Sequence, residues 1–282
     1  MKITAIVENV SKSDTLLSQY GLSLFVETKS GNIVVDAGQD NQSLDNFYTL
    51  GLNPTSINAL VVSHNHFDHI GGLQYYIDAT SDNEIPVYIS ANISSIIISK
   101  RFLRRRAVVS RNELVENNQG RMKFVKNSLQ VLPNVYACVV QGADEAFLCK
   151  DKKLRMIDAK GRMIPDDFQH EIYVAVIEDD SIKIISPCSH MGIINIIRDA
   201  QKRFGLPVKC FVGGLHLRGA SSNSLNCSKK HVFTLADKLK ETQLEKLYTC
   251  HCTGFKAYSM LKQHLKGFLK FRYFHTGQSF EI

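Results

Sequence analysis

Residues 59–72 read ALVVSHNHFDHIGG, and the rest of the chain is best interpreted outward from this stretch. Its first residues, 59–62, are apolar and partly β-branched, which predicts a buried strand. Four candidate metal ligands follow: His64, His66, Asp68 and His69. In an extended segment His64 and His66 point to the same side and can bind one ion. Asp68 and His69 lie past the bend that follows and can reach a neighbouring position. Imidazole and carboxylate suit zinc, iron or manganese, so the stretch predicts a metal site, with a solvated polar turn as the alternative.

The composition is that of an ordinary globular protein with a basic surface. The chain has 282 residues, of which 44% are hydrophobic and 22% charged, and this is enough for one large domain or two small ones. Its formal net charge of +7 favours an anionic substrate or a nucleic-acid contact. Simple solubility explains a modest excess of this size equally well.

Nothing in the sequence predicts a membrane protein or a secreted one. No run approaches the roughly 20 apolar residues that span a bilayer, and residues 1–9, MKITAIVEN, resemble a first strand more than a signal peptide. The seven cysteines are scattered and odd in number, which favours reduced thiols and a cytoplasmic location. Cys250-His251-Cys252 lacks a second Cys/His pair at zinc-finger spacing, so we interpret these cysteines as structural. Homo-oligomerisation stays open.

Hydrophobic periodicity predicts alternating strands and helices, which is typical of an α/β layered plan. Strands are expected at 2–8, 22–28, 33–39, 87–90, 207–214 and 246–250, with a hairpin over 171–190 and two short strands closing the chain. Helices are expected at 41–50, 72–79, 92–99, 191–205, 231–242 and 255–266. No linker or repeat is evident. We therefore expect one domain over 1–282, with an elaboration at about 100–170 that packs over the metal edge.

Further polar residues stand where buried strands end. His190 and His251 each follow a core strand, and strand ends of this kind converge on one edge of a sheet. The Ser-His-x-Gly turn at His190 lies between a strand and an amphipathic helix and favours a metal ligand over a core histidine. Asp36 either orients the metal histidines or merely starts a turn, and the residues themselves support both.

The motif His64-x-His66-x-Asp68-His69 after a hydrophobic strand resembles the signature of the metallo-β-lactamase superfamily, and Asp36-x-Gly38 resembles its first motif. SHNHFDHIGGL, PCSHMGIINI, GGLHL and CHCTGF together resemble a subgroup of metal-dependent hydrolases. That subgroup includes the dihydropterin-methyl-ribofuranosylaminobenzene-phosphate synthase of archaea, which condenses a pterin diphosphate with an arylamine. The resemblance spans roughly 20–282. It implies a four-layer αββα sandwich with one or two divalent ions, zinc foremost and iron or manganese as alternatives.

The resemblance also implies roles for the candidate ligands. The expected tighter metal position consists of His64, His66 and His190, and the expected second position of Asp68, His69 and His251. Asp68 is also a candidate base, and Asp36 would orient the histidines by hydrogen bonding without binding the metal itself.

One departure concerns the second metal position. The strand that ends in a bridging aspartate in the commonest two-zinc pattern here ends Gly213-Gly214-Leu215-His216, without a carboxylate. Asp199 and Asp237 fall within predicted helices and do not replace it. Either His216 takes part in the second position, or that position is weak, or His216 is a catalytic acid or substrate contact.

These features predict a metal-dependent enzyme that acts on a small anionic, phosphorylated substrate. The reaction would use metal-activated water or metal-stabilised departure of diphosphate. Arg101 and Arg105, in the basic stretch 100–111, are candidates for binding the phosphate, and a solvated loop is the alternative. A thioesterase or lactonase, a nucleic-acid processing factor and a non-catalytic metal-binding protein are the rivals. No membrane partner is expected, and nucleic acid is disfavoured because aromatic residues are not interleaved with the basic run.

Overall fold

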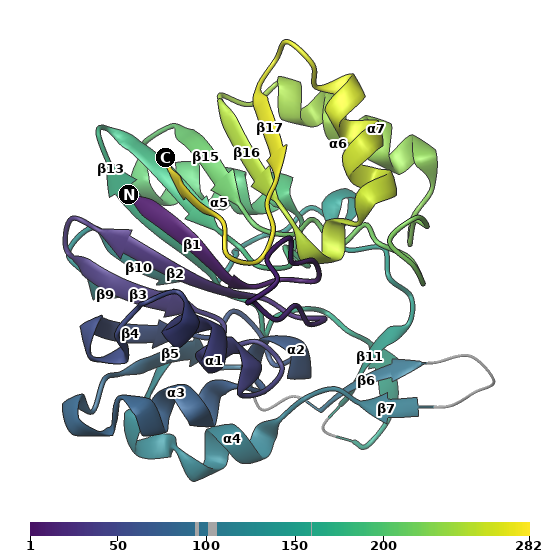
Figure 1. Ribbon diagram of the computed structural model, residues 1–282. Coiled ribbons are helices and arrows are strands. Elements are labelled where there is room, and N and C mark those ends of the chain that lie inside the picture. Colours follow the sequence, from purple (N-terminus) through teal and green to yellow (C-terminus); the bar gives the residue numbers. More distant parts are fainter. Residues whose placement is uncertain (94–95, 101–105, 159) are drawn as a thin grey trace. The chain divides into compact units, whose positions relative to one another are not determined.

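The structure is a computed structural model that describes residues 1–282 except 94–95, 101–105 and 159 (Figure 1). It divides into two compact units, each of which we describe by itself. Unit 1 consists of residues 1–126, 152–172 and 275–282, and unit 2 of residues 127–151 and 173–274. The expectation of one domain over the whole chain stays a prediction.

Unit 1 is built on a seven-stranded sheet with the order β18-β1-β2-β3-β4-β5-β8. Strands β3, β4, β5 and β8 run parallel, and β18, β1 and β2 complete the sheet by antiparallel pairing. The strands are β1 (Lys2–Val7), β2 (Ser23–Thr28), β3 (Gly31–Val35), β4 (Ile57–Val61), β5 (Val87–Ser90), β8 (Met122–Val125) and β18 (Ser279–Glu281). The helices are α1 (Gln42–Thr49), α2 (Phe67–Ile70), α3 (Leu73–Ala79) and α4 (Asn112–Asn117), with 3-10 turns η1 (Pro54–Ser56), η2 (Ser81–Asn83) and η4 (Gln119–Arg121).

The helices of unit 1 pack on one face of this sheet through a continuous apolar core. Phe25, Val34 and Leu60 lie in one row across β2, β3 and β4. Phe47 of α1 meets Phe25 edge-on at 5.1 Å between ring centroids, and Tyr76 of α3 meets Phe47 at 6.0 Å. Each such buried side chain stabilises the fold by about 1.5–3 kcal/mol. This packing fixes the helices, and with them the loops at the strand ends.

A second, four-stranded sheet of unit 1 has the order β12-β11-β6-β7. Its strands are β6 (Ile97–Lys100), β7 (Arg106–Val108), β11 (Leu154–Ile157) and β12 (Met163–Pro165). The helix expected at 92–99 was therefore wrong, because residues 97–100 form β6. Consecutive β-branched residues favour a strand, and β6 finds its partner in β11, far along the chain.

Unit 2 is built on a seven-stranded sheet with the order β17-β16-β15-β14-β13-β10-β9. Strands β14 to β17 run parallel, and the β13–β14 hairpin turns at Asp179 and Asp180 with φ of 51° and 53°, as a type I′ turn requires. The strands are β9 (Ser128–Leu132), β10 (Val135–Cys138), β13 (Tyr173–Glu178), β14 (Ser181–Ile185), β15 (Val208–Val212), β16 (Lys246–Thr249) and β17 (Lys270–Tyr273). The helices are α5 (Ile193–Phe204), α6 (Lys229–Lys240) and α7 (Phe255–His264), with η5 (Glu145–Phe147) and η6 (His251–Thr253).

Each unit therefore contains a seven-stranded sheet and a set of helices, and the predicted α/β class is confirmed. Three strands within 100–170, namely β8, β9 and β10, belong to the two seven-stranded sheets, and the elaboration expected there stays a prediction. Among the described residues, no helix combines the length and the apolar character needed to cross a bilayer.

Candidate metal centre

The metal-ligand stretch of unit 1 lies at the carboxyl edge of two parallel strands. Val35 of β3 pairs with Val61 of β4, so the residues that follow the two strands leave the sheet side by side. Asp36 follows β3, and the loop from Ser63 to His66 follows β4. Adjacent parallel strands thus position these polar groups together at one edge.

Asp36 is the hydrogen-bonding centre of this edge. Its Oδ1 accepts the Ser63 backbone N–H at 2.6 Å, and its Oδ2 accepts the Ser63 hydroxyl at 2.7 Å. The same Oδ2 lies 2.6 Å from Nδ1 of His69. A carboxylate only accepts hydrogen bonds, so this contact places a proton on Nδ1 of His69.

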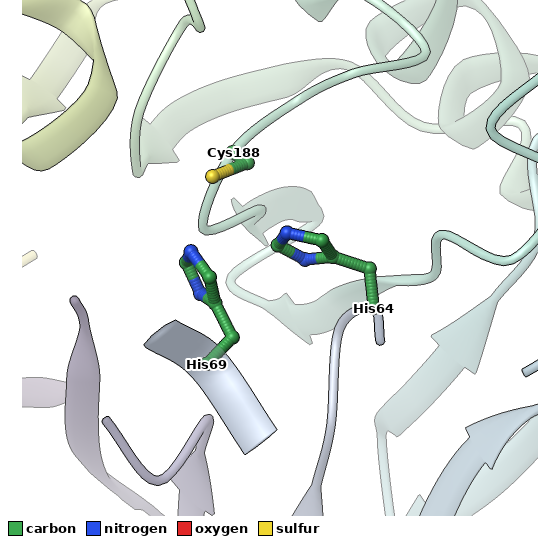
Figure 2. A group of neighbouring side chains, drawn as sticks. All are labelled: His64, His69 and Cys188. Carbon is green, nitrogen blue, oxygen red and sulfur yellow. The ribbon is translucent and has the colours of Figure 1, made fainter. Parts of the chain in front are cut away.

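The histidine rings of the stretch lie together inside unit 1. Figure 2 shows His64 and His69 as neighbours, and their ring centroids are 4.2 Å apart. His66 lies 4.5 Å from His64 on the same measure, and all three side chains are buried. Asp68 is also buried, with Oδ2 3.7 Å from Nε2 of His69. The four residues predicted from the sequence are therefore brought together, although their roles as ligands stay predictions.

Two residues that the sequence reasoning missed join this group. Asp166 and His170 are buried, and Nε2 of His170 lies 3.2 Å from Oδ2 of Asp166. One ligand atom from each of His66, Asp166 and His170 lies within 4.8 Å of the others. Ile172 donates its N–H to the Ser63 carbonyl at 2.7 Å, which ties this segment to the metal loop. An Asp-x-x-x-His spacing just before a buried strand was the available signal.

The donor set fits a divalent ion. Several imidazole and carboxylate groups lie close together in the interior, where burying a charge or a lone pair without a hydrogen bond or an ion costs free energy. Nδ1 of His170 is buried and has no hydrogen-bond partner within the described structure. A cluster of this kind suits zinc, iron or manganese more than calcium or magnesium, which prefer sites of oxygen alone.

Unit 2 places three histidines after three neighbouring parallel strands. His190 follows β14, His216 follows β15 and His251 follows β16, and the strands pair in that order. The rings of His190 and His216 have centroids 4.2 Å apart. The predicted grouping of His190 with His64 and His66 joins residues of both units, so it stays a prediction.

Several of these strand-end residues adopt a left-handed backbone, which side chains other than glycine rarely do. The φ angles are 60° at Asp36, 55° at Ser189, 45° at His216 and 48° at His251. Each such residue costs about 1–3 kcal/mol. The surrounding structure sustains that strain at the turns that carry the candidate ligands, as is typical of functional sites.

Thiols add to the histidines of unit 2. The ligand atoms of Cys149, His190 and His216 lie within 4.8 Å of one another, and so do those of a second group, Cys188, His251 and Cys252. Cys188 is the third residue labelled in Figure 2. The sequence analysis interpreted Cys250 and Cys252 as structural and had no local signal for Cys149, which lies in an irregular segment after η5.

Charges around His216 shift its titration and that of a neighbouring thiol. Burial alone would lower the pKa of the His216 imidazole, but the charge of Cys149 and the Asp151 carboxylate hold it well above its ordinary value. Burial alone would raise the pKa of the Cys252 thiol, but hydrogen bonding to Cys188 and His216 brings it well below the usual range. Cysteine sulfur and imidazole therefore lie close together in unit 2.

The basic stretch is described only in part. Arg101 and Arg105, the predicted phosphate contacts, lie outside the described residues. Arg111 is described, and its guanidinium carbon lies 5.7 Å from the centroid of the Phe67 ring in α2. Its backbone N–H also donates to Oδ1 of Asn65 at 2.7 Å, within the metal loop. One partly exposed arginine of this stretch is thus held beside the histidines of unit 1.

Comparisons with known proteins agree with this picture. Residues 19–132 match the family model of the metallo-β-lactamase superfamily. The chain is 29% identical, over 273 residues, to a protein of Methanocaldococcus jannaschii named 7,8-dihydropterin-6-methyl-4-(beta-D-ribofuranosyl)-aminobenzene-5'-phosphate synthase. That match covers 93% of this chain and 89% of the relative. A second, uncharacterized protein of the same organism is 25% identical over 280 residues, or 98% of each chain.

The fold is also that of a solved structure. Tm1679, described as a metal-dependent hydrolase of the β-lactamase superfamily, is 24% identical and has a TM-score of 0.79. The match covers 100% of this chain and 99% of that protein. At this identity the likeness shows the fold alone.

Proposed function

We propose that this chain, of which residues 19–132 match the family model of the metallo-β-lactamase superfamily, is a metal-dependent enzyme acting on a small phosphorylated molecule. The observation that carries the proposal is the buried group of His64, His66 and His69, oriented by Asp36 and Ser63. Histidines that only pack in a core do not require adjacent rings held in fixed orientations. A metal centre does require them, because the orientation of each imidazole ring sets the geometry of the metal ligands.

The side chains of unit 1 have distinct parts in this proposal. A divalent ion held by the imidazoles would supply a lowered pKa for bound water and positive charge for an anionic group. Asp36 holds the proton of His69 on Nδ1, and the Ser63 hydroxyl, 2.7 Å from Nδ1 of His64, fixes the second ring. Asp68 lies beside His69 as the candidate base.

Positive charge near the histidines supports an anionic substrate. Arg111 is held over the Phe67 ring, which belongs to the same short helix as Asp68 and His69. A guanidinium binds phosphate oxygens bidentately and with fixed geometry. The name of the M. jannaschii relative, a synthase whose product is a phosphate ester, supports the same substrate class. Hydrolysis of a phosphoester or diphosphate, and transfer with departure of diphosphate, both suit this arrangement.

The test combines metal analysis with a substrate panel. Protein purified without added metal is assayed for bound divalent ions, then loaded with zinc, iron or manganese and offered phosphoesters, diphosphates, thioesters and lactones. We expect turnover of a phosphoester or diphosphate that a chelator abolishes and added metal restores. His64→Ala should lose both bound metal and turnover, while His264→Ala, a partly exposed histidine of α7 paired with Asp237, should keep both.

Two outcomes would overturn the proposal. Equal metal content in His64→Ala and the parent protein would remove the metal centre from this loop. Turnover of thioesters or lactones without turnover of any phosphate compound would assign the protein to the rival hydrolase class.

A further inference from the structure

We infer that a groove between α6 and α7 of unit 2 binds a small molecule that combines an aromatic ring with a phosphate group. The two helices are neighbours (Figure 1), and Nε2 of His264 in α7 lies 2.8 Å from Oδ1 of Asp237 in α6. The groove has a volume of about 640 Å³, within the roughly 300–1,000 Å³ of small-molecule sites. None of the described residues that line it is a candidate metal ligand, so the inference does not rest on the function proposed above.

Apolar side chains from both helices form the walls of the groove. Phe233 of α6 lines it from one side, and Phe255 and Met260 of α7 line it from the other. The exposed fractions of the two phenylalanine side chains are 41% and 37%. Two large rings exposed to water beside one groove favour a ligand that covers them, because removing apolar surface from water is favourable.

Each of these two phenylalanine rings is packed against a further ring of unit 2. The ring centroids of Phe233 and His264 are 5.3 Å apart, and those of Phe255 and Tyr273 are 4.9 Å apart. Tyr273 in turn lies 5.4 Å from Tyr258 on the same measure. Rings that are restrained before binding lose little conformational freedom when a ligand packs on them, which suits them to recognise a planar ring.

Two lysines add positive charge to the groove. Lys229 and Lys256 line it, and each lies in the first turn of its helix. Across the described parts of the chain neither lysine has a carboxylate partner, whereas Lys238 and Lys240 in the last turn of α6 pair with acidic residues. The first turns of both helices also contain no acidic residue. Two such charges beside aromatic walls favour a doubly charged anion, and lysine is a common phosphate ligand.

The spacing of these residues gives the groove a direction. Lys229 and Phe233 are four residues apart in α6, and Lys256 and Met260 are four apart in α7. Residues four apart lie on the same face of a helix. Each helix therefore presents a cation near its N-terminus and an apolar side chain one turn later. A ligand with a phosphate at one end and a ring at the other matches this order.

The loop before α6 adds a polar residue to the groove. Asn223 lines it, and its side-chain amide can donate a hydrogen bond to a phosphate oxygen. The neighbouring Ser222 carbonyl accepts the Lys256 N–H at 3.1 Å, and the Ser224 hydroxyl accepts the Ser221 N–H at 2.9 Å. These hydrogen bonds fix the part of the loop that carries Asn223.

The extent of the exposed apolar surface favours a small molecule over a protein partner. A stable protein interface buries about 800 Å² on each partner around an apolar centre. Phe268 is also exposed, but Nζ of Lys240 lies 4.9 Å from the centroid of its ring, and Phe268 does not line the groove. The apolar surface at the groove is thus the two phenylalanines and Met260, which is enough to cover one or two fused rings.

Acetylation of the two lysines in the unmodified protein reports on the groove itself. The protein is treated with limiting acetic anhydride with and without 1-naphthylphosphonate, and each lysine is measured by peptide mass spectrometry. At about ten times its Kd, the phosphonate should slow acetylation of Lys229 and Lys256 about tenfold. Acetylation of Lys202, an exposed lysine of α5, should not change. Methylphosphonate, which has no ring, and 1-naphthylmethanol, which has no charge, should not protect either lysine at the same concentration.

Variants measured by titration calorimetry separate the two halves of the groove. Lys256→Gln should weaken binding of 1-naphthylphosphonate about tenfold, through loss of one charge-assisted contact. Phe233→Leu should weaken it about two- to tenfold, through loss of one aromatic pair. Both side chains are exposed, so thermal denaturation should match that of the parent protein. Lys202→Gln and Tyr48→Leu, at an exposed position of α1, are the matched controls and should keep the parent Kd.

Several outcomes would overturn the inference. Equal protection by methylphosphonate would reduce the groove to a pair of lysines that attract any anion. Protection by vesicles of phosphatidylserine, with none by 1-naphthylphosphonate, would assign the groove to a membrane surface. An unchanged Kd in both Lys256→Gln and Phe233→Leu would place the ligand elsewhere. His64→Ala should bind 1-naphthylphosphonate as the parent does; loss of binding there would locate the ligand at the metal centre, whereas failure of the metal-dependent function would leave lysine protection unchanged.

Discussion

Oδ2 of Asp36 lies 2.6 Å from Nδ1 of His69, although the two residues are 33 positions apart in the chain. The same oxygen accepts the Ser63 hydroxyl, so one carboxylate links the end of β3 to the loop after β4 and to α2. The pair is fully buried. Its effect is to select the tautomer of His69 and the direction of its ring.

Asp36→Asn should therefore weaken metal binding. An amide oxygen can replace one acceptor, but the amide N–H₂ cannot accept from Ser63 or from His69. We expect a loss of about 10–100-fold in affinity for zinc, measured by competition with a chromophoric chelator. Asp45→Asn, at an exposed position of α1, is the matched control. An affinity equal to that of the control would mean that Asp36 only shapes the turn.

His170→Phe tests the pair that the sequence reasoning missed. The substitution keeps an aromatic ring but leaves the buried Asp166 carboxylate without its imidazole partner. We expect a loss of about 1–3 kcal/mol in the free energy of unfolding, together with reduced retention of metal during dialysis. His264→Phe provides the control. A loss of stability with full metal retention would identify a structural pair only.

Arg111→Ala tests whether the arginine beside the metal loop contacts the substrate. A charge-assisted hydrogen bond to phosphate contributes about 1.5–3 kcal/mol, so KM for a phosphorylated substrate should rise at least about tenfold. Metal content should not change. Arg162→Ala, whose exposed side chain pairs with Asp158, is the control. If KM rises equally in both variants, Arg111 makes no specific contact.

Asp199→Asn should affect stability and not metal binding. Asp199 accepts the Tyr173 hydroxyl at 2.6 Å and an Arg203 N–H at 3.0 Å, and all three side chains are largely buried. Removing the carboxylate charge leaves Arg203 uncompensated, which should cost about 3 kcal/mol in urea denaturation. Asp237→Asn, at an exposed pair on α6, should leave the denaturation midpoint unchanged. Equal midpoints in the two variants would contradict this account.

Gly192→Ala should disturb the segment that carries Cys149. Gly192 has φ of 84°, and a Cβ there would meet the Phe147 carbonyl. Gly205 has φ of 67° with open space around it. Gly205→Ala should therefore cost only the strain of a left-handed backbone, about 1–2 kcal/mol, while Gly192→Ala should cost more in the free energy of unfolding, because the clash with the Phe147 carbonyl is added to that strain. Thermal denaturation of the two variants measures this difference, and equal midpoints would show that the segment around Phe147 shifts to make room for the added methyl group.

The sequence by itself determined where the strands end and which polar residues stand there. A strand alternates its side chains with period two, and a buried parallel strand is apolar over its whole length. Such a signal is local, so the stretch 59–72, Asp36, His190 and His251 could be placed at strand ends from the order of residues alone. The α/β class follows from the same periodicity.

Tertiary structure alone decided which distant segments join these strand ends. Residues 97–100 form β6 because β11, more than fifty residues later in the chain, pairs with them as an antiparallel strand. A helix over these residues would not make these hydrogen bonds between strands. Asp166 and His170 reached His66, and Cys149 reached His190, through hydrogen bonds between backbone segments far apart in the chain. Such contacts depend on non-local packing, which no local periodicity encodes, so the second half of the candidate site became visible only in the fold.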